Sequence, residues 1–101
     1  MNTHLVPDDT RTVGELEAAG CQLWQLSLHN YSDVDWHLDR DGVFAKGFTQ
    51  EVDRRIKLVG IRIGIKPDHV VARFGDHVIR HPDGRWTVRH APADTGTEGA
   101  A

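Results

Sequence analysis

The chain of 101 residues contains one cysteine, Cys21, and no long apolar run. A single thiol excludes an internal disulfide and points to a reducing compartment. No stretch approaches the roughly 20 apolar residues that a membrane-spanning helix needs, and the N-terminus, MNTHLVPDDT, lacks the basic and apolar regions of a signal peptide. We therefore expect a soluble, cytoplasmic protein without a membrane partner.

Motifs of metal sites and of common catalytic centres are missing as well. The chain has seven histidines but no CxxC or HExxH pattern, and His77 and His81 lie too far apart along a strand to share a zinc ion. Neither Ser27 nor Ser32 lies in a nucleophile elbow. We therefore expect no metal, no cofactor and no enzymatic activity. An enzyme would require a buried pair of Cys21 and a histidine, which a pH profile of thiol reactivity would reveal.

Charge is distributed unevenly along the chain. Residues 1–50 carry eight acidic residues against three Lys or Arg, whereas residues 51–90 carry nine Lys or Arg against five acidic residues. An asymmetry of this kind can steer the choice of partner, although it does not determine the fold. Two solvated surfaces that differ in charge without any role in binding would give the same counts.

Residues 56–90 have the clearest strand pattern. Val59, Ile61, Ile63 and Ile65 alternate with glycine or basic residues, which is the period of a strand with one buried face. Pro67 breaks the alternation, a second apolar run follows at 70–74, and glycine and aspartate then interrupt again. This region therefore predicts several short consecutive strands.

The clearest turn in the chain is HPDGR at 81–85. Pro82 suits the second position of a type I turn and Gly84 suits the left-handed conformation, which favours a three-residue loop with His81 opposite Arg85. The alternative is a two-residue Asp83-Gly84 turn, which would pair His81 with Trp86. The register decides whether the histidines cluster, because the second arrangement also pairs His77 with His90.

The segment IRIGIKPDHVVARFGDHVIRHPDGRWTV contains Gly75, Asp76, Ile79 and Arg80, followed by Gly84 and Trp86. This arrangement resembles the C-terminal segment of a group of small tailed-phage and prophage proteins, in which a GDWIIRG-type motif precedes a glycine and an aromatic residue. His77 stands where that group usually has tryptophan, and its Tyr-Pro continuation is missing. Because the group has no established activity, the resemblance implies a genomic setting, and hence the cytoplasm of a host cell, rather than a mechanism.

Two helices are predicted outside this region. Thr12 and Glu15 fit a capping box for a helix at 13–19, which Gly20 can end. Phe48, Val52 and Ile56 recur every fourth residue, which favours a helix at about 50–58 that Thr49 could cap. If that second helix is wrong, the strand of the central region starts earlier.

Three further strands are predicted in the first half of the chain. Residues 21–29 form an apolar run with strand propensity, and residues 43–48 follow a turn ending at Gly42. In residues 33–39, Val34, Trp36 and Leu38 alternate strictly with polar residues. We expect these three side chains to face the core of one sheet.

Together these patterns predict a single α+β domain at residues 12–90, in which a mainly antiparallel, twisted sheet of about five to seven short strands carries one or two short helices. We expect a flexible N-terminus at residues 1–11 and a disordered tail at residues 91–101. Most of the core is expected from Trp24, Leu26, Val34, Trp36, Leu38, Val59, Ile61, Ile63 and Val71.

An acidic strand face is the leading candidate for a binding site. If residues 33–39 form a strand, the polar side chains all face solvent at roughly 6.5 Å intervals. Aspartate is a poor strand former, so we expect that a function, rather than local stability, explains these aspartates. A solvated edge strand that uses charge to avoid aggregation would give the same sequence pattern. We predict a non-enzymatic binding protein of phage or mobile-element type, such as an inhibitor or anti-defence factor, which contacts a basic surface of a host protein through Asp33, Asp35, His37 and Asp39.

Nucleic-acid or nucleotide binding is the alternative prediction. Arg54, Arg55, Lys57, Arg62 and Arg73 precede three further arginines, and Phe74 and Trp86 lie among them. Arginines and aromatic rings on a sheet can hold phosphates and stack on bases, but the net charge of −3 and the missing recognition motifs oppose this function. The residues we predict to contact phosphate are Arg80, Arg85 and Arg89.

Overall fold

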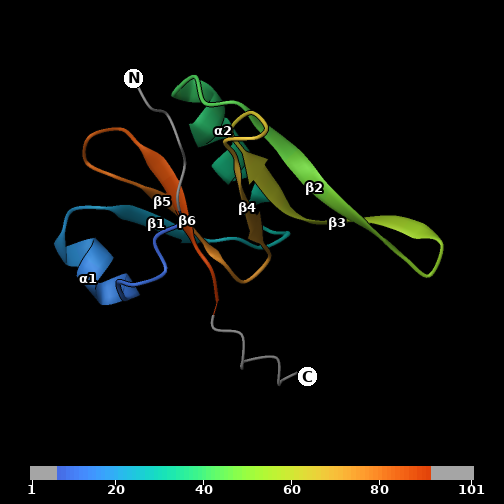
Figure 1. Cartoon of the computed structure of the whole chain (residues 1–101), viewed down its shortest axis with the longest axis horizontal. Coiled ribbons are helices and arrows are strands. Elements are labelled where there is room, and N and C mark those ends of the chain that lie inside the picture. The colour runs from blue at the N-terminus through green and yellow to red at the C-terminus, as the bar shows by residue number, and fades with distance from the viewer. Residues whose placement is uncertain (1–6, 92–101) are drawn as a thin grey trace.

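A computed structural model describes residues 7–91, which fold into six strands and two short helices. The strands form two antiparallel three-stranded sheets (Figure 1), which confirms the predicted α+β class. In chain order the elements are α1 (Val13–Ala18), β1 (Gln22–Gln25), α2 (Tyr31–Arg40), β2 (Ala45–Val52), β3 (Arg55–Ile63), β4 (Val70–Arg73), β5 (His77–Arg80) and β6 (Trp86–Arg89).

The first sheet has the strand order β1-β5-β6 and the second has the order β2-β3-β4. Figure 1 shows α1 beside β1 and α2 near the start of β2, while the twisted β2–β3 ribbon extends away from the other elements. The two sheets meet where β4 lies against β6. Neither described helix therefore covers the outer part of the second sheet.

The β5–β6 hairpin has the predicted three-residue loop. His81 N donates to Arg85 O at 2.7 Å, and Gly84 has a φ of 90°. A glycine suits this position because a side chain is strained at positive φ. His77 is therefore opposite Arg89 rather than His90.

Residues 33–39 are helical, so the strand predicted there was wrong. Val34 and Leu38 are four residues apart and fully buried, whereas Trp36 is 56% exposed. Strict alternation placed all three side chains together, but a helix also buries residues at i and i+4. Of the aspartates that fit a strand poorly, Asp33 and Asp39 are exposed on this helix and Asp35 is partly buried.

The helix predicted at 50–58 is also wrong, because these residues form the end of β2, a tight turn and the start of β3. Asp53 and Arg54 make the turn with φ values of 51° and 66°. Two successive residues at positive φ are typical of a two-residue hairpin turn, which usually contains asparagine or glycine. Asp53 suits the first turn position, but Arg54 stands where glycine is usual, so the sequence signal of the turn is weak. The strand starts earlier, as the alternative prediction stated.

Other local predictions agree with the structure. The Thr12 hydroxyl accepts from Glu15 N at 3.1 Å and Thr12 N donates to Glu15 Oε1 at 2.8 Å, which confirms the capping box of α1. The strand predicted at 43–48 lies within β2 and its flank, while the run at 21–29 is a strand only over β1.

The core formed by the described residues has two clusters. The larger joins Leu26 and the α2 residues Val34 and Leu38 to both sheets, and the smaller joins Leu16, Cys21 and Ile79 beside α1. Of the predicted core, Leu26, Val34, Leu38, Ile61 and Ile63 are buried and Trp24, Val59 and Val71 are partly buried, whereas the prediction omitted Leu16, Val70, Ala72, Val78, Ile79, Trp86 and Val88.

Polar contacts attach residues 8–11, part of the predicted flexible N-terminus, to the end of the first sheet. Asp8 N donates to Val88 O at 2.8 Å, Arg89 Nε donates to Arg11 O at 2.6 Å, and His90 N donates to Asp9 Oδ1 at 2.8 Å. Apart from Ala91, the predicted disordered tail lies outside the described residues, as do residues 1–6. Neither helix in the described part of the chain is long and apolar enough to span a membrane.

Candidate functional site

The four residues predicted to form an acidic face all lie on α2, but they do not share one side of it. A helix turns about 100° per residue, so residues two apart in sequence point in very different directions. Asp33 and Asp39 are exposed and Asp35 is partly buried. His37 lies inward, with its ring 5.0 Å from that of Trp24 and its Nε2 3.8 Å from Asp33 Oδ2.

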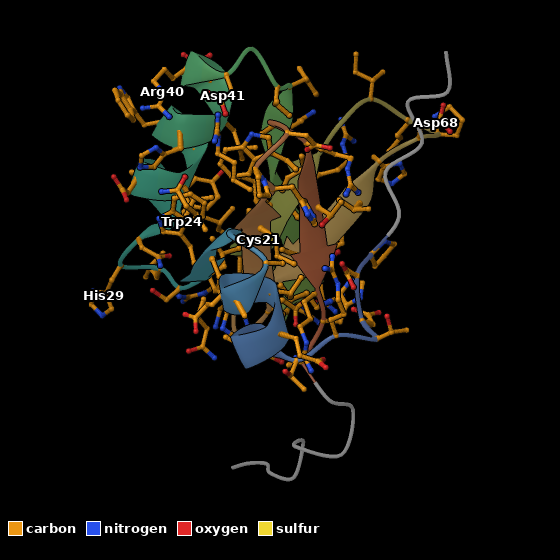
Figure 2. The ribbon with its side chains drawn as sticks, turned by 90° about the vertical axis from the view of Figure 1, so that its left-hand side faces the viewer. Cys21, Trp24, His29, Arg40, Asp41 and Asp68 are labelled. Atoms are coloured by element: carbon orange, nitrogen blue, oxygen red, sulfur yellow. The ribbon has the colours of Figure 1, made fainter. Side chains whose placement is uncertain are left out.

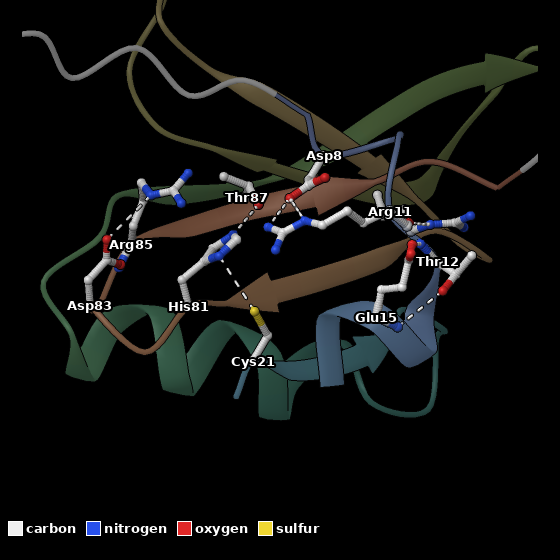
Figure 3. Close-up of polar contacts among 10 residues, drawn as sticks. Asp8, Arg11, Thr12, Glu15, Cys21, His81, Asp83, Arg85 and Thr87 are labelled. Atoms are coloured by element: carbon white, nitrogen blue, oxygen red, sulfur yellow. Dashed lines mark hydrogen bonds and ion pairs between the residues drawn. The ribbon is translucent and has the colours of Figure 1, made fainter. Parts of the chain in front are cut away.

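The three arginines predicted to contact phosphate already have acceptors within the chain. Arg80 Nε donates to Asp41 Oδ2 at 2.6 Å, and Arg89 Nε donates to the Arg11 carbonyl. Arg85 pairs with Asp83 at 3.7 Å in the hairpin loop (Figure 3). The hairpin register also places Arg80 and Arg89 on opposite faces of the first sheet, so the three do not form one surface.

A buried Cys21–His81–Thr87 cluster lies at the edge of the first sheet, where Cys21 precedes β1, His81 follows β5 and Thr87 belongs to β6 (Figure 3). His81 Nδ1 is 3.5 Å from Cys21 Sγ, and its Nε2 is 2.8 Å from the Thr87 hydroxyl oxygen. Such a cysteine–histidine pair is the arrangement that an enzyme would require. Sequence reasoning could not find it because 60 residues separate Cys21 from His81.

The burial of this cluster indicates a packing role. Cys21 is 9% exposed, His81 is 4% exposed and Thr87 is fully buried. Burial lowers the pKa of His81, which keeps the ring neutral and able to accept at one nitrogen and donate at the other. A neutral imidazole between a thiol and a hydroxyl satisfies all three polar groups, and the enclosed sulfur has little access to a substrate.

The outer face of the second sheet gathers basic side chains from three strands. Residues opposite one another in an antiparallel ladder point to the same face. In one row across the sheet, Lys46 is opposite Arg62 and Arg62 is opposite Val71. In the next row, Phe48 is opposite Gly60 and Gly60 is opposite Arg73. Beyond the irregularity at Phe48/Thr49, Gln50 is opposite Lys57. Val52 is opposite Arg55, which is two residues from Lys57 on β3 and therefore points to the same side. We call the set Lys46, Phe48, Arg55, Lys57, Arg62 and Arg73 the cationic face.

No carboxylate interrupts this face within the described strands. Glu51 is the only acidic residue of β2, β3 and β4, and it is opposite Ile56 on the other side of the ribbon. Phe48 lies in the middle, with the Arg73 guanidinium carbon 5.3 Å from its ring centroid. Arg73 also donates to Gln50 Oε1 at 3.1 Å, which fixes the direction of the guanidinium.

Sequence reasoning named Arg55, Lys57, Arg62 and Arg73 but missed Lys46 and Phe48. Both alternate with small residues in the strand predicted at 43–48, and this alternation indicated that they share one face of that strand. Their meeting with Arg62 and Arg73 depends on strand pairing, which the sequence does not display.

A comparison of the chain with protein-family models, curated proteins and solved structures finds no match. The resemblance to prophage proteins thus stays a prediction.

Proposed function

We propose that this protein is a non-enzymatic binder of single-stranded nucleic acid, which it holds on the cationic face. The supporting observation is that five Lys or Arg residues from three strands share one sheet face with Phe48 and with no acidic strand residue. Basic side chains attract the phosphate backbone, and an aromatic ring on a sheet provides a stacking surface for a base.

The net charge of −3 does not oppose this function once the charges are placed in the fold. The aspartates of α2 lie on a different element, and two of the arginines in the first sheet are engaged in internal contacts. Attraction between exposed charges is screened beyond about 8 to 10 Å at physiological ionic strength. A nucleic-acid strand bound to the cationic face therefore interacts mainly with the basic residues of that face.

Binding of a fluorescently labelled thymidine oligonucleotide, followed by anisotropy, tests this proposal. Replacing Lys57 and Arg73 together by glutamine should weaken binding about tenfold, because two phosphate contacts are lost while the exposed positions tolerate the change. Arg85→Gln is the matched control, since Arg85 lies outside the second sheet and pairs with Asp83. Equal losses in both variants would contradict the assignment of the face.

A second candidate function, docking on a basic surface of a host protein, is favoured by Trp36. This side chain is 56% exposed on α2, its ring lies 5.3 Å from the Arg40 guanidinium carbon, and the exposed Asp33 and Asp39 lie about one turn away on either side. Exposed tryptophans are enriched among the residues that dominate protein interfaces. This candidate keeps the predicted inhibitor-like role in a host cytoplasm, with the helix in place of the strand.

A pull-down from host lysate, with and without nuclease, separates the two candidates. The α2 candidate expects a protein partner that survives nuclease and is lost on Trp36→Ala and on replacement of Asp33, Asp35 and Asp39 by asparagine. The nucleic-acid proposal expects recovery of nucleic acid, or of proteins only while nucleic acid is intact. Retention of one nuclease-resistant partner by both α2 variants would eliminate the docking face.

A further inference from the structure

A pocket of about 320 Å³ opens on the cationic face. Lys46 and Phe48 of β2, Arg62 of β3 and Val71 of β4 line it, and Lys66 and His69 contribute from the loop between β3 and β4. No acidic residue is among the described residues that line this pocket; Asp68 belongs to the same loop but is not part of the lining. The pocket thus combines three cations with two apolar side chains.

Arg62 provides the strongest indication of a ligand. Its Nε atom is buried and has no hydrogen-bond partner among the described residues. The guanidinium carbon lies 5.9 Å from the centroid of the Phe44 ring, so an aromatic neighbour supports the charge but offers no conventional acceptor. A buried donor without an acceptor is costly, and a shift of the guanidinium towards an incoming oxygen ligand would remove that cost.

The charges around Arg62 specify an anionic acceptor. Lys46 is beside Arg62 across the β2–β3 ladder, and Lys66 lines the same pocket. A guanidinium fork with two ammonium groups suits a phosphate, because phosphate offers several acceptor oxygens. His69 Nδ1 lies 3.2 Å from the Pro67 carbonyl, and donation of its proton there leaves Nε2 to accept a hydrogen bond from a ligand hydroxyl.

The size of the pocket indicates more than a phosphate ion. Its volume lies at the lower end of the range of small-molecule sites, about 300 to 1,000 Å³. We infer that the pocket binds one phosphorylated nucleoside, with the phosphate at Lys46, Arg62 and Lys66 and the nucleoside against Phe48 and Val71. The nucleotide is either free or one unit of a strand. This inference rests on the proposed function, because the pocket forms part of the cationic face.

Titration with 5′-AMP, with adenosine as the comparison ligand, tests the pocket by calorimetry and by amide chemical shifts. We expect AMP to bind and adenosine to bind at least about tenfold more weakly, since the phosphate supplies the charge-assisted contacts. Arg62→Gln should weaken AMP binding by about tenfold or more, and Lys46→Gln should also weaken it. Arg85→Gln should have no effect, and its thermal unfolding serves as the folding reference for the variants.

Absence of AMP binding, or equal losses in Arg62→Gln and Arg85→Gln, would overturn the pocket. The same variants with an oligonucleotide separate this result from the proposed function. If the oligonucleotide binds and depends on Lys57 and Arg73 but not on Arg62, the pocket fails and the cationic face stands. If the affinity for AMP depends on Arg62 but the oligonucleotide binds no more tightly than AMP, the pocket assignment stands and the proposed binding of single-stranded nucleic acid fails. Tighter binding of a 5′-phosphorylated than an unphosphorylated oligonucleotide would support capture of a strand end, and equal affinity with Arg62 dependence would support an internal nucleotide.

Discussion

Arg80 and Asp41 form a close ion pair, with 2.6 Å between Arg80 Nε and Asp41 Oδ2. Trp86 Nε1 donates to the same oxygen at 3.0 Å. Asp41 directly follows α2 (Figure 2), whereas its partners lie on β5 and β6, so this carboxylate ties the end of the helix to the first sheet. Arg80 is consequently a structural residue rather than a free cation.

Replacing Asp41 by asparagine should lower the urea midpoint of unfolding more than Asp83→Asn, because the Asp83 pair is exposed. The hydrogen bonds from Arg80 and Trp86 lower the pKa of Asp41. Folding therefore gains stability from its ionised form above the unfolded pKa of about 3.8, and this gain is lost as the pH falls through the folded pKa. The difference between wild type and Asp41→Asn should shrink in acid, and a constant difference would contradict the ion-pair account.

Leu38 and Trp36 should respond very differently to truncation. Leu38→Ala removes a fully buried side chain and should cost about 2 to 5 kcal/mol of unfolding free energy. Trp36→Ala removes an exposed ring and should cost less than about 1 kcal/mol. Denaturant unfolding measures both. Similar losses in the two variants would instead fit a strand in which both side chains face the core.

The α2 and β2–β3 regions show where sequence reasoning reached its limit. Val34 and Leu38 fit both a strand alternation and a helical repeat, and only the packing of α2 against the sheets distinguishes them. Asp53 and Arg54 give only a weak turn signal, since Arg54 stands where such a turn usually has glycine. In contrast, the Pro82 and Gly84 loop was predictable because both residues have restricted or special backbone conformations.

His90 and His81 should give the protein opposite responses to pH. Burial opposes the charged form of both rings and lowers the pKa of His81; at His90 the contacts with Asp9 and the Val71 carbonyl outweigh burial and raise the pKa. Stability should thus fall as the pH rises from 6.5 through the folded pKa of His90, and also fall as the pH drops from 6.5 towards that of His81.

Urea unfolding between about pH 5 and pH 8 measures both limbs of this curve. His90→Gln should flatten the alkaline limb and leave the acidic one. His77 contributes to the acidic limb as well, because burial lowers its pKa. An alkaline limb that is unchanged in His90→Gln would show that this histidine is not held in its charged form by the fold.

Cys21 should react slowly with a thiol reagent in the native protein and rapidly once urea unfolds it. The sulfur is nearly enclosed and lies beside a neutral His81. A nucleophile that serves an enzyme would instead react rapidly at neutral pH, with a rate that falls as the pH drops through the pKa of its thiolate. Thiol labelling at several pH values therefore tests whether Cys21 serves as an enzymatic nucleophile.

The candidate site was predictable in composition but not in position. Arg62 and Arg73 were recognised as basic residues of strands, yet their alignment with Lys46 and Phe48 depends on the β2–β3–β4 register. Conversely, the internal partners of Arg80 and Arg89 arise from Asp41 and from the Arg11 carbonyl, which are distant in sequence. Long-range pairing thus decided which arginines are available to a ligand.

The most direct test of the central claim is the salt dependence of oligonucleotide affinity. If the cationic face binds phosphates, the logarithm of the association constant should fall linearly with the logarithm of the salt concentration, and the double replacement of Lys57 and Arg73 by glutamine should reduce the slope by about 1.4. Arg85→Gln should retain the wild-type slope. Failure to bind at low salt, or a slope that is unaffected by the double replacement, would contradict the proposed function.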